Sequence, residues 1–372
     1  MLAGWVDTRR DHGKLIFIDL RDVGGIIQLV FTPQQEEVYK LGNSLRSEWV
    51  VMVNGEVKRR PAGMENEAIP TGQVEINVEN IEILSEAETP VFDLSGDGHE
   101  VSEELRLQYR YIDLRRPRMQ KNIRFRSQFS QLAREFLLDK GFIEIETPIL
   151  TRSTPEGARD FLVPSRLHPG KFYALPQSPQ QYKQLLMVSG FERYFQFARA
   201  LRDEDLRRDR GLEHTQIDLE MSFVTREDVM KLVEELVVSV LEKLGRKIFQ
   251  KPFPRYSYQE AMRKFGTDKF DLRNDKTSKE LAFAWVIDFP VFEKNREGKW
   301  TYSHNPFTAP RPEDEKRLLK GEIKDLISLQ YDLVCNGEEV GGGGIRINKP
   351  ELLEKVFEII GQSHKEIEEK FG

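Results

Sequence analysis

The densest polar segment of the sequence covers residues 199–220 and reads RALRDEDLRRDRGLEHTQIDLE. Its second half is typical of a β-strand, with Gln216, Asp218 and Glu220 at alternate positions and therefore on one face. A polar strand face inside a large domain costs free energy unless water or a ligand meets it. Arg side chains match phosphate oxygens, so the neighbouring arginines favour a phosphate-bearing ligand over an ordinary solvated face.

A second candidate site lies in residues 331–348, YDLVCNGEEVGGGGIRIN. Asn336-Gly337 between two β-prone runs predicts a two-residue hairpin, which places Val334 opposite Glu339. The same register puts Asp332 on the face of Glu339, one diagonal step away. Two carboxylates on one face repel each other unless a cation lies between them. Mg²⁺ bridged to substrate phosphates is the common solution, so this hairpin predicts a magnesium site.

The four glycines 341–344 follow that hairpin directly. They would allow a ligand to approach the backbone closely, whereas a flexible loop is the ordinary alternative. The strand-like run 345–347 that follows favours the first interpretation. Strict alternation would turn Arg346 away from Glu339, so a bulge in the glycine run is needed if both residues serve one site.

Composition narrows the class of protein without revealing its function. The chain has 372 residues, 39% of them hydrophobic and 32% charged, and a net charge of -6, which is typical of a soluble protein with two or three domains. Its single cysteine, Cys335, excludes an intramolecular disulfide and suits a reducing compartment. The sequence shows no membrane span and no signal-peptide core, so we expect a cytoplasmic protein without a membrane partner. A local basic stretch, residues 106–126, holds eight Lys or Arg against one Asp and could follow phosphates or form a solvated helix face.

The elements that would position these residues differ along the chain. Closely spaced strands and one helical stretch in the first 85 residues predict a five-stranded OB barrel. The acidic segment 85–104 resembles a linker. Beyond it, strands and helices do not alternate regularly, which favours an antiparallel sheet with flanking helices and an α+β fold. We therefore predict an OB domain at 1–86, a hinge at 87–120 and a second domain at 121–372.

Three elements of the second domain have clear signals. A helix is predicted from about residue 122 to Gly141, and a strand follows at 142–150, where Pro148 indicates an edge or an interface. A second helix starts at Thr225, with Asp228 completing a capping box, and ends at Gly245. Shorter strands are predicted between these helices, at residues 172–175, 193–200 and 215–223.

Together these segments resemble a bacterial-type aspartyl-tRNA synthetase, a class II aminoacyl-tRNA synthetase. RRDHGKLIFIDLRD resembles the family's anticodon-binding OB domain, GFIEIETPIL resembles motif 1, and LRDEDLRRDRGLEHTQIDLE resembles motif 2. The segments STPEGARDFLVPSR, QSPQQYKQLL, NPFTAP and NGEEVGGGGIRI resemble its aspartate- and ATP-binding segments. The resemblance implies a homodimer formed through motif 1. It also implies Mg²⁺- and ATP-dependent activation of L-aspartate to aspartyl-adenylate, followed by transfer to tRNA.

The resemblance also assigns individual residues. Arg202 would hold the α-phosphate and the substrate carboxylate, and Glu204 would read the adenine amino group. His214 stands where the family usually has a Phe that stacks on adenine. Two cations, Lys183 and Arg346, would grip the substrate side chain. The aspartate set is Glu156, Gln180, Lys183, Arg202, Asp218, His304 and Arg346, the ATP set is Arg202, Asp203, Glu204, Gly211, His214 and Glu339, and the Mg²⁺ set is Asp332 and Glu339.

In the OB domain the resemblance implies a single-stranded RNA reader. Phe17 matches a base-stacking aromatic, and Arg10, Gln28 and Glu75 match anticodon-reading positions. His12 and Gly63 match positions that relax the third anticodon base in the non-discriminating subgroup. Charging of both tRNA(Asp) and tRNA(Asn) is therefore expected.

The chain departs from the family pattern at three places. It begins inside the first OB strand, it lacks a large insertion between Leu272 and Leu281, and it ends at Gly372, before the segment where class II enzymes have motif 3. That motif supplies an arginine for the ATP γ-phosphate, so the sequence predicts weak or absent adenylate formation by the chain as it stands.

Two other functions remain in competition with the synthetase. A non-catalytic tRNA- or RNA-binding paralogue, or a fragment with little activity, would need none of Gln180, Lys183, Glu339 or Arg346, so their presence favours the enzyme. A related enzyme that activates asparagine or lysine is disfavoured by the cations Lys183 and Arg346, because the amide or ammonium side chain of such a substrate gains nothing from two positive charges.

Overall fold

The computed structural model describes residues 1–153, 158–205, 211–295 and 297–362, and the chain divides into two compact units, residues 1–123 and 124–372. The first unit is built on a closed barrel of strand order β1-β2-β3-β5-β4. Its strands are β1 (Leu2–His12), β2 (Leu15–Arg21), β3 (Ile26–Phe31), β4 (Val50–Arg59) and β5 (Val74–Ser85). The predicted OB-type barrel is confirmed.

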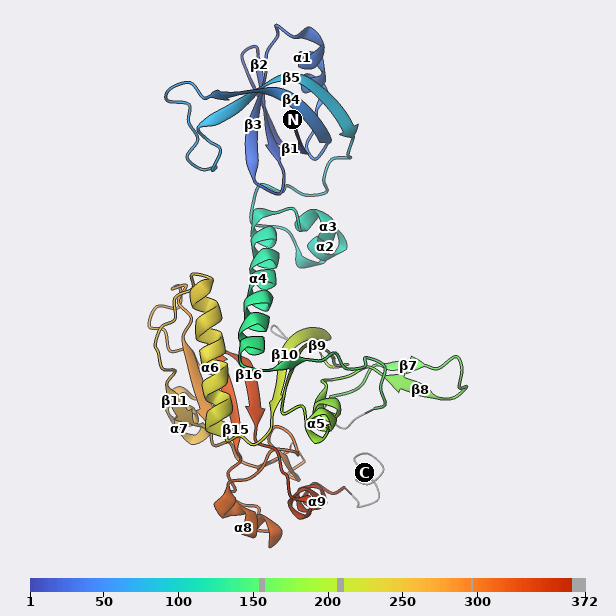
Figure 1. Cartoon of the computed structure of the whole chain (residues 1–372), viewed down its shortest axis with the longest axis vertical. Coiled ribbons are helices and arrows are strands. Elements are labelled where there is room, and N and C mark those ends of the chain that lie inside the picture. Colours follow the sequence, from blue (N-terminus) through green and yellow to red (C-terminus); the bar gives the residue numbers. More distant parts are fainter. Residues whose placement is uncertain (154–157, 206–210, 296, 363–372) are drawn as a thin grey trace. The chain divides into compact units, whose positions relative to one another are not determined.

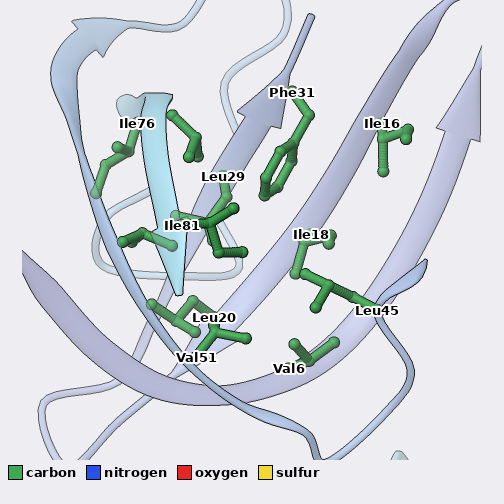
Figure 2. Close-up of a cluster of buried hydrophobic side chains, with 12 residues drawn as sticks. Val6, Ile16, Ile18, Leu20, Leu29, Phe31, Leu45, Val51, Ile76 and Ile81 are labelled. Carbon is green, nitrogen blue, oxygen red and sulfur yellow. The ribbon is translucent and has the colours of Figure 1, made fainter. Parts of the chain in front are cut away.

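Alternation of apolar residues fills the barrel. Ile16, Ile18 and Leu20 of β2 are buried, and Figure 2 shows them pointing into one cluster with Leu29 and Phe31. The helix α1 (Glu36–Ser44) lies between β3 and β4. It ends at Ser44, because Leu45 has an extended ψ of 143°, and a guanidinium nitrogen of Arg46 donates to the carbonyls of residues 43, 44 and 45 at this end of the helix.

The basic stretch 106–126 is partly satisfied within the first unit. Short helices α2 (Glu103–Gln108) and α3 (Arg110–Asp113) begin this stretch. The fully buried Asp113 accepts hydrogen bonds from Arg110 and Arg116, at 2.8 and 3.1 Å. Arg116 is itself fully buried, and Arg115 donates to Glu48. Three of the eight basic side chains, those of Arg110, Arg115 and Arg116, therefore bind carboxylates of the same unit. For the rest of the stretch, the choice between a phosphate-binding patch and a solvated helix face stays a prediction.

The second unit contains two sheets that share one core. One has the order β10-β9-β6 and the other β11-β12-β15-β16. The helix α6 (Arg226–Lys243) packs against both sheets, because its Met230 belongs to one hydrophobic cluster with Leu219 of the first sheet and with Trp285 and Leu333 of the second. Figure 1 shows α6 in yellow beside these strands. The strands are β6 (Ile143–Glu144), β9 (Arg193–Leu201), β10 (Glu213–Met221), β11 (Arg255–Ser257), β12 (Phe283–Ile287), β15 (Gln330–Cys335) and β16 (Glu338–Gly344).

Helices connect the strands of these sheets along the chain. The capping box predicted at Thr225 and Asp228 is present and opens α6. The other helices are α4 (Pro117–Asp139), α5 (Gln180–Val188), α7 (Tyr258–Phe265), α8 (Glu315–Leu319) and α9 (Pro350–Ile359), with a 3₁₀ turn at Pro312–Asp314. Two small hairpins complete the described part, β7 (Leu162–Pro164) with β8 (Phe172–Ala174) and β13 (Phe292–Lys294) with β14 (Trp300–Tyr302). The α+β prediction is confirmed, and within the described residues no helix is long and apolar enough to cross a membrane.

Two local predictions need correction. The strand predicted at 142–150 extends only over Ile143–Glu144, because the chain then leaves β9 and the amide of Thr147 donates to the side chain of Gln196 instead. Two edge pairs, β6 with β9 and β11 with β12, are parallel rather than antiparallel.

The hairpin of β15 and β16 follows the predicted register. Val334 lies opposite Glu339, and the ladder then shifts, leaving Val340 as a bulge just before the glycine run. A Cβ on Gly342 would lie 2.7 Å from Asp332 Oδ1. At Gly343 and Gly344 the corresponding space is taken by the side chains of Tyr331 and Thr308. At these three glycines, therefore, the close approach comes from neighbouring side chains of the protein rather than from a ligand.

Candidate active site

A buried ion network joins α5 to β10. Lys183 Nζ lies 2.8 Å from Asp218 Oδ1 and 3.0 Å from Glu220 Oε2, and the lysine is only 7% exposed. The alternation of β10 places Asp218 and Glu220 on one face, as the sequence predicts. A buried ammonium is tolerated here because two carboxylates compensate for its lost hydration.

Arg346, which follows β16, joins this network from the other sheet. Its Nε donates to Glu220 Oε1 at 2.9 Å, and its terminal nitrogen donates to the side chain of Gln180. Gln180 and Lys183 are three residues apart on α5 and so share a face. Glu220 thus accepts from both cations that the sequence assigns to the substrate side chain.

The charges of this network reinforce one another. Burial works against the charged form of Lys183, but Asp218 and Glu220 outweigh it and raise the lysine's pKa. Burial likewise opposes ionisation of Glu220, yet Lys183 and Arg346 lower its pKa below the ordinary value. The hydroxyl of Tyr194 faces the same carboxylates, and burial together with Asp218 raises its pKa. The raised pKa of Lys183 and the lowered pKa of Glu220 keep these two groups ionised at neutral pH.

A second cluster surrounds Asp332 on β15. The carboxylate is 3% exposed, accepts a hydrogen bond from Gln330 Nε2 at 2.8 Å and lies 3.3 Å from His304 Nε2. Burial lowers the pKa of His304, but the hydrogen bond and charge of Asp332, helped by Glu339, more than reverse this and raise it. A Cβ added to Gly342 would lie 3.6 Å from Glu339 Oε1 and 2.7 Å from Asp332 Oδ1, so both carboxylates approach the same point. The two carboxylates therefore converge, as the hairpin argument predicts.

The motif 2 residues lie along the connection between β9 and β10. Arg202 follows β9 directly, its amide donates to the carbonyl of Leu212 at 2.8 Å, and its buried Nε has no hydrogen-bond partner among the described residues. The amide of Asp203 donates to the carbonyl of Arg159. Three further candidates border this connection: Glu204 and Gly211 are exposed, and His214 lies on β10 opposite Ala200. Glu156 falls outside the described residues.

On the barrel, the candidate anticodon residues form a continuous polar row. Arg10 donates to Asp19 at 2.9 Å and to Gln28 at 3.2 Å, and Gln28 donates to Glu75 at 2.8 Å. Phe17 lies opposite Arg10 in the β1–β2 ladder, on the face away from the apolar core.

The two remaining candidates on the barrel, His12 and Gly63, are not members of the hydrogen-bonded row of Arg10, Gln28 and Glu75. His12 ends β1 and is exposed. Gly63 lies in the connection between β4 and β5 with φ 81°, a left-handed conformation that favours glycine.

Some residues of these clusters have no role predicted from sequence. The alternation of β10 predicts the face of Glu220 but not its pairing with Arg346, which is 126 residues away. Asp19, on the outer face of β2, pairs with Arg10 in the same way. Lys269, which lies 2.9 Å from Glu339 Oε2, carries no sequence signal at all, because it stands alone after α7.

Comparisons with known proteins agree with this organisation. Residues 102–372 match the family described as tRNA synthetases class II (D, K and N), and residues 1–84 match the OB-fold nucleic acid binding domain. An aspartate–tRNA(Asp/Asn) ligase of Syntrophomonas wolfei is 41% identical, with 100% of this chain and 85% of that protein covered. The ligase of the same name from Rubrobacter xylanophilus is also 41% identical, over 100% and 82%. The Syntrophomonas match runs over 498 residues, more than the 372 of this chain, so that relative carries segments without a counterpart here.

Solved structures show the same fold. The asparaginyl-tRNA synthetase of Pyrococcus horikoshii, complexed with asparaginyl-adenylate, superposes with a TM-score of 0.76 at 26% identity, covering 99% of this chain and 85% of that one. The aspartyl-tRNA synthetase of Entamoeba histolytica has a TM-score of 0.77 at 21% identity, covering 99% and 80%. Since the class II match covers most of the chain and curated relatives align over all of it, the chain belongs to the class II tRNA synthetases of the D, K and N group.

Proposed function

We propose that this protein is an aspartate–tRNA ligase, which activates L-aspartate with ATP and transfers it to tRNA(Asp) and tRNA(Asn). The observation that carries this proposal is the pair of cations, the buried Lys183 and the half-buried Arg346, which meet at Glu220. A substrate carboxylate can replace or share those partners with charge-assisted hydrogen bonds. The amide of asparagine carries no charge that could pair with these two cations, and the ammonium of lysine would be repelled by them. The names of the curated relatives support the same substrate.

In the proposed reaction the substrate carboxylate attacks the α-phosphate of ATP, and pyrophosphate leaves. Arg202, whose buried Nε lacks a hydrogen-bond partner among the described residues, is suited to hold the α-phosphate and the attacking carboxylate together. Glu204, Asp203, Gly211 and His214 border the same connection and would contact the adenosine side. Gln180, Asp218 and His304, with Glu156 outside the described residues, would orient the aspartate. No covalent nucleophile is required, so positioning and charge neutralisation supply the rate.

The converging carboxylates fit a divalent cation. Asp332 and Glu339 would hold Mg²⁺, which when bound neutralises phosphate charge. The protein prepares this site by burying Asp332 and by fixing one of its oxygens with the amide of Gln330.

We assign tRNA recognition to the outer face of the barrel. Phe17 would stack on a base, while Arg10, Gln28 and Glu75 already form a hydrogen-bonded row that can exchange partners with base edges. His12 and Gly63 are assigned to tolerance of the third anticodon base. We propose that residues 1–86 bind the anticodon, that residues 87–120 form the hinge and that residues 121–372 form the catalytic domain. The proposed location of the protein is the cytoplasm.

Aminoacylation of two transcripts tests the proposal. With ATP, Mg²⁺ and aspartate, we expect aspartylation of both tRNA(Asp) and tRNA(Asn), even if the adenylate forms as weakly as the sequence predicts. Aspartate should support ATP–pyrophosphate exchange at least about 100-fold better than asparagine does, because the uncharged amide cannot form the charge-assisted hydrogen bonds that a carboxylate would form with Lys183 and Arg346. Absence of aspartyl-tRNA(Asn) with normal charging of tRNA(Asp) would limit the protein to one tRNA. Binding of tRNA without exchange would instead favour the non-catalytic RNA-binding alternative.

We also propose a homodimer formed around the motif 1 segment. A groove of about 500 Å³ beside this segment is lined by Leu150, Phe172, Tyr173, Tyr182 and Leu185. Several of these apolar side chains are strongly exposed, and exposed apolar surface of this kind marks an interface. Beside α5, the hydroxyl of Ser222 donates to Met187 Sδ at 3.2 Å, and the next residue, Phe223, is 95% exposed.

Phe223 offers a clean test of this interface. Its φ is 58°, a left-handed conformation that Asn adopts more readily than an aromatic residue, so Phe223→Asn should preserve the fold. Loss of the apolar contact should raise the dimer dissociation constant about tenfold or more, as measured by sedimentation velocity. Val57→Asn, at an exposed apolar residue on the barrel, is the matched control. Equal dissociation constants for Phe223→Asn and the unaltered chain would contradict the proposed interface.

A further inference from the structure

One lysine without a role in the proposed mechanism lies beside the converging carboxylates. Lys269 Nζ is 2.9 Å from Glu339 Oε2, and the two side chains are 34% and 28% exposed. An ion pair this open to solvent contributes little to stability, because water screens it and two long side chains lose freedom. The contribution of this ion pair to fold stability therefore does not account for the position of the Lys269 ammonium beside Glu339.

The position of Lys269 is set by its neighbours in the chain. The next residue, Phe270, is buried, and its carbonyl accepts a hydrogen bond from Gly337 at the hairpin turn, at 3.1 Å. This anchor ties the backbone beside Lys269 to the hairpin that carries Glu339. The lysine side chain is thereby held close to that carboxylate while its ammonium stays accessible.

The two oxygens of Glu339 have different partners. Oε2 faces Lys269. Oε1 lies on the side of Gly342, where an added Cβ would be 3.6 Å from this oxygen and 2.7 Å from Asp332 Oδ1. The ammonium thus lies on the outer oxygen and leaves the inner one turned toward Asp332. A cation between the two carboxylates and the ammonium of Lys269 could therefore be present at the same time, one on each side of Glu339.

We propose that Lys269 is a further phosphate-binding residue, which contacts the polyphosphate of ATP. The inference rests on the proposed function. Glu339 would help to hold Mg²⁺, which would supply positive charge to the polyphosphate, and the ammonium of Lys269, 2.9 Å from Glu339 Oε2, lies beside the position where those phosphates would bind. Lysine binds phosphate as a point charge on a flexible stem, and an exposed ammonium can move from a carboxylate to a phosphate without a new desolvation cost.

Nucleotide binding by calorimetry tests this proposal without turnover. Lys269→Met should weaken binding of a non-hydrolysable ATP analogue in Mg²⁺ about 10- to 100-fold, the effect of one charge-assisted hydrogen bond. Binding of AMP, which lacks the β- and γ-phosphates, should not change. Lys269→Arg should restore most of the loss. Lys140→Met is the matched control, since Lys140 forms a similarly exposed pair with Glu235 at 2.8 Å.

Three results would overturn the role of Lys269. The first is unchanged binding of the ATP analogue by Lys269→Met, and the second is equal weakening of the analogue and AMP. The third is the absence of any further loss when Lys269→Met is added to Glu339→Gln, because the lysine would then act only through that carboxylate. Failure of the unaltered chain to bind the ATP analogue would instead count against the proposed function itself.

Discussion

Replacing Lys183 with methionine should lower kcat/KM for aspartate in ATP–pyrophosphate exchange by about 100- to 1,000-fold, the range expected when one partner of a buried ion pair is removed. The lysine is almost fully buried between Asp218 and Glu220, so the variant leaves two carboxylates where the substrate carboxylate must bind. Like charges would then repel the substrate. Methionine keeps the volume and shape of the stem, so the effect comes from the charge.

The same change should reduce the free energy of unfolding by about 3 kcal/mol at neutral pH, measured by urea titration. Lys183 and Arg346 lower the pKa of Glu220, so their stabilisation is present above its ordinary value of 4.5 and is lost as the pH falls through the lowered pKa. The difference between the variant and the unaltered chain should therefore narrow in acid. Lys183→Arg tests whether charge alone is sufficient, and Lys140→Met controls for loss of an exposed ion pair. Unchanged exchange with a normal fold would contradict the assignment of Lys183.

The hairpin shows why part of the site could be predicted from sequence. Asn336-Gly337 sets the turn, the turn sets the register, and the register places Val334 opposite Glu339. Each of these steps is local in sequence. The position of the bulge was harder to predict, because Val340 rather than a glycine leaves the ladder, and that choice depends on how Asp332 and Tyr331 fill the space over the glycines that follow.

Contacts between distant segments lie beyond such reasoning. Alternation in β10 predicts that Asp218 and Glu220 share a face, yet nothing local indicates that Arg346 from the other sheet completes the network. Only the shared core under α6 brings the two sheets together. The same limit applies to the basic stretch 106–126. The sequence leaves open whether its cations meet phosphates or water, because Asp113 and Glu48, which bind three of its arginines, become their partners only in the folded unit.

Family resemblance filled part of that gap, in a way that local physics could not. The resemblance assigns Lys183 and Arg346 to the same part of the substrate, and in the structure both residues bind the carboxylate of Glu220. It was silent on Glu220 and Lys269. Both are held by charge pairing with named site residues, so they could be found only from distances.

Asp332→Asn should lower ATP–pyrophosphate exchange by about two to three orders of magnitude, the usual cost of losing one preorganised group that stabilises developing charge. Asparagine keeps the shape, and its carbonyl oxygen can still accept from Gln330 Nε2, but one of the two charges facing the cation is lost. The Mg²⁺ concentration for half-maximal exchange should rise accordingly.

Two measurements separate loss of the cation from a damaged fold. A non-hydrolysable aspartyl-adenylate analogue has no polyphosphate, so the Asp332→Asn variant should bind it with nearly the affinity of the unaltered chain. Asp314→Asn is the matched control, because Asp314 is also buried but accepts from Arg317 and the amide of Ile327, away from both clusters. A similar fall in exchange for both variants would mean that burial of a carboxylate, rather than its position beside Glu339, carries the effect. An unchanged Mg²⁺ dependence in Asp332→Asn would remove this residue from the cation site, and the converging carboxylates would then need another explanation.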